Sequence, residues 1–253
     1  MRICLKNFCM IFKGRGKMVD LTVEKKVNVG LAVFGVILSL AGSIITTSSI
    51  SMMNVNFMGR GMSMEMAYEN MGLVVFGSIL GLIATIFLLI VYHQWSSVLN
   101  TNVTNTINIF EYLKQKDPDK APEYEAFLKS LRNIKVPSWP YWLFFISMLL
   151  YWFLPYLVIF SILSIVFFLI HLHNVFAVAD KLQELKGKAY REFGNLPQGI
   201  NAIRTRNVLI VLLLTIVTLG IYWIYLIIKL SSEINSFIEV DRMARQAILS
   251  KVS

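Results

Sequence analysis

Methionines gather between two apolar segments, where residues 51–71 hold seven of the chain's 12. Met62, Met64 and Met66 alternate along the chain, and their thioether sulfurs are soft ligands of the kind that bind Cu(I). This spacing predicts a copper site at an outer membrane surface. However, the stretch has no histidine or cysteine, and unbranched methionines also fill irregular gaps at lipid interfaces. We favour the gap-filling role and expect no resident cofactor.

The histidines and cysteines are poorly placed to share a metal ion. His171 and His173 are two residues apart, so a helix directs them to nearly opposite faces. His93 also follows an apolar segment, and all three histidines are predicted to be polar ends of membrane helices. Cys4 and Cys9 lack the second pair of ligands that a zinc site requires.

Charged residues are absent from four long apolar segments, residues 27–50, 71–92, 139–170 and 208–228. Ion-coupled transporters usually keep ionisable groups at membrane depth, so this absence argues against coupled transport. Hydroxyl groups could still line a pore, which makes a small-solute or ion transporter or channel the alternative function. These hydroxyls include Ser39, Ser78, Thr85, Ser147, Ser164, Thr215 and Thr218. Phosphate loops, nucleophile elbows and CxxC pairs are also missing from the sequence, so we do not expect an enzyme.

Composition places the chain in a membrane. Of its 253 residues, 56% are hydrophobic and only 15% are charged, whereas soluble domains have about 25% charged residues. The formal charge of +9 fits basic cytoplasmic loops and anionic lipids, and no nucleic-acid-binding motif accompanies it. We expect the lipid bilayer as partner and no nucleic acid.

The predicted fold is all-α and polytopic, with four apolar segments forming four to six membrane helices and amphipathic cytoplasmic helices beside them. Within the N-terminal part, Met18 looks like a more ordinary start, so residues 1–17 are expected to be an upstream extension. The predicted parts are a basic cytoplasmic N-terminus (1–26), a membrane helix pair (27–93) with a methionine-rich outer connector (51–70), cytoplasmic amphipathic helices (94–138), an aromatic membrane hairpin (139–172), a cytoplasmic helix and linker (173–206), and a membrane segment with an amphipathic tail (207–253).

Small residues recur every four positions in the first two apolar segments. Such stripes let membrane helices approach closely, so we expect them to pack the two helices as an antiparallel pair. The predicted packing residues are Gly35, Ser39 and Ser43 in the first helix, and Gly77, Gly81 and Thr85 in the second.

The distribution of Lys and Arg predicts the topology. Residues 1–26 hold seven of them and residues 51–70 hold only Arg60, so the N-terminus is expected in the cytoplasm and this connector outside. Basic loops on both sides of 139–172 favour a hairpin there over one tilted, kinked crossing. For 207–229 we favour a single crossing, because a turn at Leu219-Gly220 leaves backbone groups to satisfy in lipid.

Three helix exits resemble one another: IVYHQWSSVLN (90–100), FLIHLHNVFAV (168–178) and LIIKLSSEINS (226–236). Each runs from apolar residues through a polar pair into an amphipathic helix. Either an internal duplication or the common form of a helix leaving a membrane explains the likeness.

The third exit belongs to a recognisable signature. The residues Thr218, Leu219, Gly220, Ile221, Tyr222, Trp223 and Tyr225 precede a polar helix start at Ser231. This run resembles the domain of unknown function 4234 (DUF4234), a family of prokaryotic integral membrane proteins, over residues 207–235. The resemblance implies membrane location and supplies no catalytic or cofactor-binding residue.

These features predict a multi-pass protein of the plasma or inner membrane that acts without catalysis, as an interaction or scaffold protein. Its expected partners are a second copy or another membrane protein.

Overall fold

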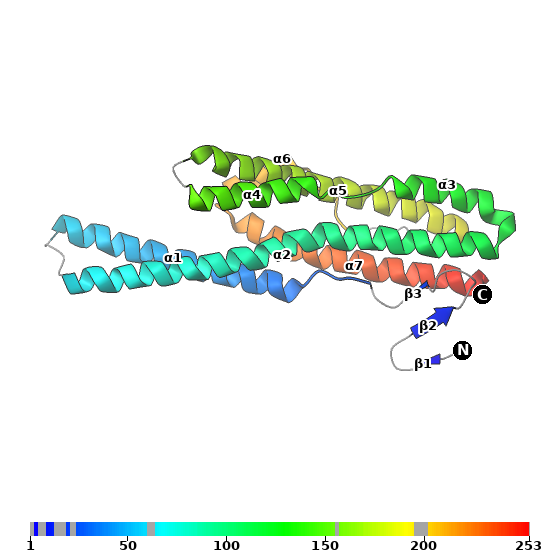
Figure 1. The fold of residues 1–253 in the computed structure, drawn as a ribbon, viewed down its shortest axis with the longest axis horizontal. Coiled ribbons are helices and arrows are strands. Elements are labelled where there is room, and N and C mark those ends of the chain that lie inside the picture. Colours follow the sequence, from blue (N-terminus) through cyan, green and yellow to red (C-terminus); the bar gives the residue numbers. More distant parts are fainter. Residues whose placement is uncertain are drawn as a thin grey trace. The chain divides into compact units, whose positions relative to one another are not determined.

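The computed structural model describes residues 3–4, 9–12, 19–20, 24–59, 64–154, 157–194 and 202–252 (Figure 1). Three short strands, β1 (Ile3–Cys4), β2 (Cys9–Phe12) and β3 (Val19–Asp20), pair antiparallel in the order β1-β2-β3. All other regular elements described are helices. They are α1 (Val29–Gly59), α2 (Met64–Lys116), η1 (Pro118–Lys120), α3 (Ala121–Arg132), α4 (Trp139–Phe153), α5 (Val158–Gly194), α6 (Val208–Val217) and α7 (Ile221–Val252). The all-α prediction is confirmed.

Three of the described helices are long and apolar enough to cross a membrane. The candidate spans are Val29–Met53 in α1, Tyr68–Lys116 in α2 and Val158–Gly194 in α5, whereas α4 and α6 are apolar but shorter. The protein is therefore an all-α polytopic membrane protein. The chain forms two compact units. One is Asn28–Tyr92, and the other combines Met1–Val27 with His93–Ser253.

Within Asn28–Tyr92, α1 and the first part of α2 pack through small residues seven positions apart. Gly35, Gly42 and Ser49 are buried on α1, and Gly77 and Ala84 are buried on α2. Seven residues make nearly two helical turns, so this spacing keeps one face against the partner helix. A Cβ added to Gly42 would lie 2.7 Å from the carbonyl oxygen of Gly77, so the two backbones are in contact.

The four-residue stripe follows this face only in part. A step of four residues rotates by about 40° beyond a full turn, so the stripe drifts off the contact. Gly35 is buried, Ser39 is half-buried and Ser43 is exposed. On α2, Gly81 and Thr85 are half-buried, and the Thr85 hydroxyl donates to the Gly81 carbonyl at 2.8 Å.

Gly77→Ala is expected to destabilise this helix pair by about 1–3 kcal/mol, the usual cost of overpacking. The new Cβ would meet the Gly42 carbonyl oxygen at 2.9 Å and the Thr46 amide nitrogen at 3.1 Å, both of them rigid backbone atoms. Gly81→Ala is the control, because its Cβ meets nothing within 4 Å. Thermal denaturation in detergent should show a lower midpoint for Gly77→Ala only. Equal midpoints for the two variants would contradict the backbone contact.

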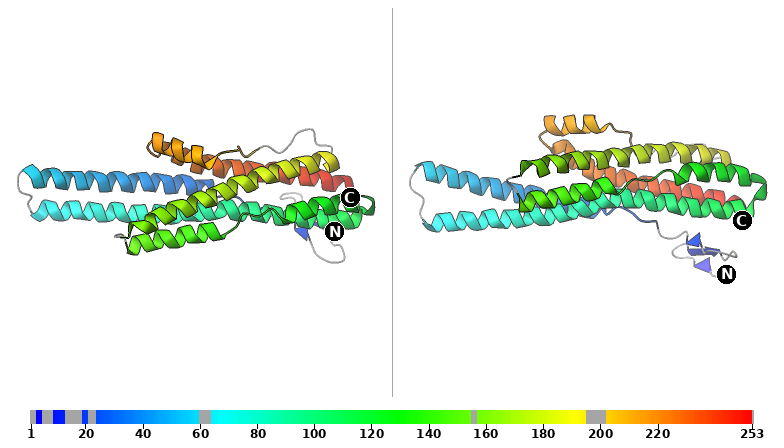
Figure 2. Two further views of the ribbon diagram at one scale, coloured as in Figure 1. Left: turned by 90° about the horizontal axis from the view of Figure 1, so that it is seen from above. Right: turned by 45° about the horizontal axis from the view of Figure 1, so that its top comes forward.

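Helices α4 and α5 fold back on one another as a hairpin (Figures 1 and 2). The ring centroids of Phe144 and Phe168 are 5.0 Å apart, and those of Tyr141 and His171 are 5.6 Å apart, so α5 returns along α4. At the turn, the Leu157 N–H donates to the Leu154 carbonyl at 3.0 Å. Of the two forms considered for residues 139–172, the structure has the hairpin.

Helices α6 and α7 form a second hairpin, which corrects the single crossing favoured for 207–229. The chain reverses at Leu219 and Gly220, whose φ angles of 51° and 90° end any helix. The backbone groups at the turn are satisfied locally: the Gly220 N–H donates to the Thr215 carbonyl at 2.8 Å, and the Tyr222 N–H donates to the Thr218 hydroxyl at 2.9 Å. For these N–H groups the objection to a turn in lipid therefore does not apply.

Four helical parts pack into a helical bundle, hereafter the bundle. They are α3, the part of α2 after His93, the part of α5 after His171 and the part of α7 after Leu230. Its core includes Leu99, Leu182 and Ile234, all fully buried. By contrast, α4, α6 and the preceding parts of α5 and α7 leave large apolar side chains exposed, as lipid contact requires. Among the described bundle residues, Val240 and Met243 are the large apolar side chains that remain exposed.

Candidate functional site

The bundle core contains a buried carboxylate held by donors from three helices. Asp241 of α7 is 0% exposed. Its Oδ1 lies 2.9 Å from Lys186 Nζ of α5 and accepts from the Tyr190 hydroxyl at 2.8 Å. Its Oδ2 accepts from Asn102 Nδ2 of α2 at 2.7 Å and lies 2.9 Å from Arg245 Nε. Charge-assisted bonds of this kind are the stronger hydrogen bonds in proteins.

Lys186 has a full set of acceptors. Besides Asp241, its ammonium donates to Asn102 Oδ1 at 2.6 Å and to Thr106 Oγ1 at 2.7 Å. An ammonium has three protons, so each has a partner. Lys186 therefore joins α5 to α2 and α7 in the centre of the bundle.

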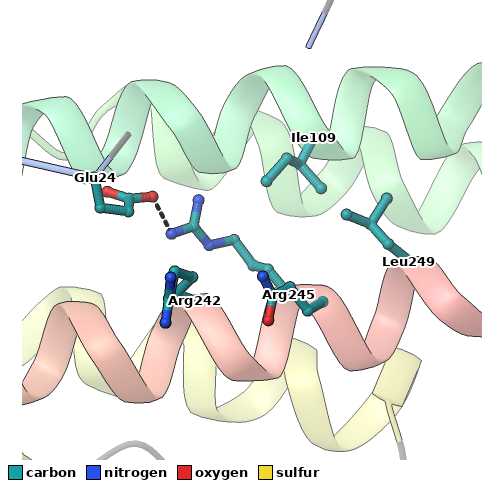
Figure 3. Close-up of a pocket in the computed structure, with 6 residues that line it drawn as sticks. Glu24, Ile109, Arg242, Arg245 and Leu249 are labelled. Carbon is teal, nitrogen blue, oxygen red and sulfur yellow. Dashed lines mark hydrogen bonds and ion pairs between the residues drawn. The ribbon is translucent and has the colours of Figure 1, made fainter. Parts of the chain in front are cut away.

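Arg245 extends this network to the segment before α1. Its guanidinium donates to Glu24, and both side chains are at least nine-tenths buried (Figure 3). A cavity of about 10 Å³, roughly the size of one water molecule, adjoins the pair and is lined in part by Arg242 and Leu249. Glu24, Lys186, Asp241 and Arg245, together with the polar partners Asn102, Thr106 and Tyr190, form the buried network.

The network pairs two anions with two cations, which limits the cost of burying them. Burial alone would raise the pKa of Asp241, but Lys186 and Arg245 more than offset it and hold that pKa below the ordinary 3.8. Burial opposes the charged form of Arg245, while Asp241, Tyr190 and Glu24 raise its pKa above the ordinary value. Asp241 and Arg245 are thus ionised at neutral pH and bind each other.

Three amide side chains of the bundle hold backbone segments in the same manner. Each amide N–H₂ donates to a carbonyl, and each amide oxygen accepts from the N–H of the same residue, with N···O distances of 2.7–3.0 Å. The clamped residues are buried and precede α1, α4 or α6. The pairs are Asn100 with Val136, Gln183 with Ile203, and Asn235 with Val27.

These three amide–backbone pairs, hereafter the amide clamps, make the three helix exits equivalent. Asn100 ends WSSVLN and Asn235 ends LSSEIN, as their sequence match requires. In the middle helix the residue equivalent to Asn100 is Gln183, at the end of VADKLQ. The sequence alignment of 168–178 with 90–100 instead places Val178 opposite Asn100. The chain thus repeats one arrangement three times: a clamped residue, a helical hairpin, and a helix that carries the next amide.

Asn235→Ala is expected to lower the stability of the bundle by about 1–3 kcal/mol, because it leaves the buried N–H and carbonyl of Val27 without partners. Ser232→Ala, on an exposed position of the same helix, is the control and should change little. Thermal melts of the two variants in the same detergent give the comparison. A thermal midpoint of Asn235→Ala equal to that of the control would show that this clamp does not stabilise the bundle.

A further ion pair closes the α6–α7 hairpin. Arg206 lies just before α6, and its two terminal guanidinium nitrogens donate to the carboxylate of Glu233 in α7, at 2.6 and 2.8 Å. Beside Arg206, between α5 and the start of α6, lies an open groove of about 660 Å³ with mostly apolar walls that include Val166, Leu169 and Leu209.

The histidines occupy the ends of apolar segments. The rings of His93 and His171 lie 5.1 and 5.6 Å from the ring of Tyr141. His171 is buried and His173 is exposed, which fits their separation along the helix. Within the part of the chain that the structure describes, no three His, Cys, Asp or Glu residues could hold a metal ion.

The side chains of the predicted copper ligands lie outside the described part of the chain. Met62 is not among the described residues, and only the backbone of Met64 and Met66 is described, at the start of α2. The copper site stays a prediction.

The signature run has a structural role in the turn. The Thr218 hydroxyl donates to the Leu214 carbonyl at 2.7 Å and accepts from Tyr222 N–H, so it ends α6 and begins α7. The Trp223 ring packs edge-on against Phe168 of α5 at 5.1 Å. The signature thus forms the hairpin and fixes it to its neighbour.

Comparison with known proteins places this segment in a family. Residues 206–249 match the model of the family described as domain of unknown function (DUF4234), and this range holds α6, the turn and nearly all of α7. The chain matches no curated protein and no solved structure. The signature in 207–235 and the wider match agree, and the chain therefore carries a domain of the DUF4234 family at residues 206–249.

Proposed function

We propose that the protein is a non-enzymatic scaffold of the plasma or inner membrane, whose bundle is a rigid cytoplasmic platform for a partner. The observation that carries this proposal is the buried network. Its charged side chains pair with one another, and the cavity beside Glu24 and Arg245 measures only about 10 Å³, which suits a fixed structure better than a substrate site.

The orientation rests on charge. With both short hairpins returning to the bundle, the segments on the bundle side hold all 24 Lys and Arg residues except Arg60. Cytoplasmic segments carry such an excess. The N-terminus and the bundle are accordingly assigned to the cytoplasm.

The partner surface includes Val240 and Met243 on α7, which are exposed one helical turn apart. Isolated apolar residues on a surface are common, so the position has to be tested directly. The partner is a second copy of this chain or another membrane protein.

A photo-crosslinking amino acid at Met243, introduced in the full-length protein in native membranes, tests the scaffold function. A discrete adduct to one protein is expected from Met243, and none from the exposed control position Glu184 on α5. Absence of any discrete adduct would contradict a partner at this face. Solute or ion flux through the purified protein in liposomes would contradict the scaffold and favour a transporter or channel.

A further inference from the structure

Two hairpins of this chain have uninterrupted apolar limbs that are too short to cross a bilayer, although α5 as a whole is long enough. Helix α4 has 15 residues and α6 has 10, so they rise about 22 and 15 Å at 1.5 Å per residue. A typical hydrocarbon core is about 30 Å thick. The return limbs are no longer, because the apolar part of α5 ends at His171 and that of α7 ends at Lys229.

The tips of both hairpins are apolar. Phe153 beside one turn is 79% exposed, and Leu219 in the other is 93% exposed. The residues between the helices are Leu154 to Leu157 in one and Thr218 to Gly220 in the other, and neither turn holds a charged residue. Large apolar side chains so exposed belong in hydrocarbon rather than in water.

The connector between α1 and α2 differs from these turns because it holds polar and charged residues beside its methionines. It and its flanks carry Asn54, Asn56, Arg60 and Glu65. These side chains suit an aqueous loop, as expected for a helix pair that crosses completely. Among the three helical hairpins, the connector between α1 and α2 is thus suited to water, whereas the turns of the other two are suited to lipid.

In a lipid environment every backbone polar group needs an internal partner, and the N–H groups at the tip of the α6–α7 hairpin have one. Thr218, Leu219 and Gly220 donate their N–H groups to α6 carbonyls at 2.8–3.1 Å. Ile221 donates to the Thr218 carbonyl at 3.1 Å, and the N–H of Tyr222 is bound by the Thr218 hydroxyl. The N–H groups from Thr218 to Tyr222 therefore need no water.

We propose that the α4–α5 and α6–α7 hairpins enter only the leaflet next to the bundle, turn within the hydrocarbon and return, with the acyl chains of that leaflet as their partner. The two tips do not reach the opposite surface. The hairpins add helix volume to one leaflet, while the connector between α1 and α2 reaches the other side.

Cysteine accessibility tests this placement in the full-length protein. Single cysteines are placed at Leu157, Leu219, Ser63 and Ser232 in a background with Cys4→Ser and Cys9→Ser. Membrane-impermeant maleimide is then added to sealed vesicles of either orientation. Ser63→Cys should react from one side only and Ser232→Cys from the other, while Leu157→Cys and Leu219→Cys react from neither until detergent is added.

Two labelling results would overturn the proposal. Reaction of a tip cysteine from the Ser63 side would show that its hairpin crosses the bilayer. Reaction from the Ser232 side would show that the hairpin lies outside it.

An unreactive tip could also be covered by protein, so a second measurement separates lipid from protein contact. Bimane attached to Leu219→Cys, in liposomes of phosphatidylcholine with brominated acyl chains, should lose at least half of its fluorescence relative to unbrominated lipid. Bimane at Ser232→Cys should not. Absence of quenching at Leu219→Cys would overturn the assignment of acyl chains as the partner.

Discussion

Asp241→Ala is expected to destabilise the bundle by about 3–5 kcal/mol, the usual result of removing one partner from a buried ion pair. The substitution leaves Lys186 and Arg245 buried without the carboxylate that both of them contact, at 2.9 Å in each case. It also removes the acceptor of the Tyr190 hydroxyl and of the Asn102 amide. The measurement is the thermal midpoint of the purified protein in detergent, with helicity followed by circular dichroism.

Glu239→Ala is the matched control for Asp241→Ala. Glu239 lies two residues away on α7 and pairs with Lys26 at 3.0 Å, but both side chains are more than a third exposed. Exposed pairs contribute about 0–1 kcal/mol, so this variant should melt close to the unmodified protein. Similar melts for the two variants would show that the buried network does not hold the bundle together.

Lys186→Met is expected to be the second large loss, again about 3–5 kcal/mol, because Asp241 stays buried with fewer positive partners. The losses of unfolding free energy caused by changes at Lys186 and at Asp241 are expected not to be additive, because the two side chains are in contact. The double variant Lys186→Met/Asp241→Leu removes both charges and should be more stable than the sum of the single losses predicts. Denaturation of Lys186→Met, of Asp241→Leu and of the double variant gives the coupling free energy.

A coupling of about 0.5–3 kcal/mol is expected for residues in direct contact. Lys188→Met is the control for position, since Lys188 is exposed on the same helix and pairs with the exposed Glu184. Strictly additive losses at Lys186 and Asp241 would contradict a shared network.

The apolar segments could be predicted from the sequence, because they depend on composition over many residues. That small residues pack α1 against α2 could also be predicted, but not which residues make the contact. The four-residue stripe omits Gly42, which the seven-residue period of a packed helix pair includes. The reversal at Leu219-Gly220 was not favoured, because the hydrogen bonds that satisfy its backbone depend on the Thr218 side chain as well as on chain length.

The buried network could have been found from the helical pattern and was missed. Lys186 follows buried Leu182 by four residues, and Asp241 follows buried Phe237 by four, so both charges fall on apolar faces. A charge at such a position predicts a buried partner, although the pattern does not say which residue supplies it. The cross-helix pairing of Lys186 with Asp241 and of Arg245 with Glu24 depends on tertiary packing.

The amide clamps connect the hairpins to the bundle. Asn100 and Gln183 fix the residues before α4 and α6, and Arg206 binds Glu233, so each short hairpin begins from a backbone held in place. The DUF4234 segment is one of the three repeated arrangements, and its hairpin depends on the turn at residues 218–220.

The distance between spin labels at Arg204 and Ser232, measured by pulsed electron paramagnetic resonance in lipid bilayers, tests this hairpin most directly. Both positions are exposed, and they flank the whole apolar segment. Because α7 returns along α6, the labels should lie less than about 20 Å apart, whereas one continuous helix would separate them by about 40 Å at 1.5 Å per residue. A dominant distance near 40 Å would contradict the hairpin.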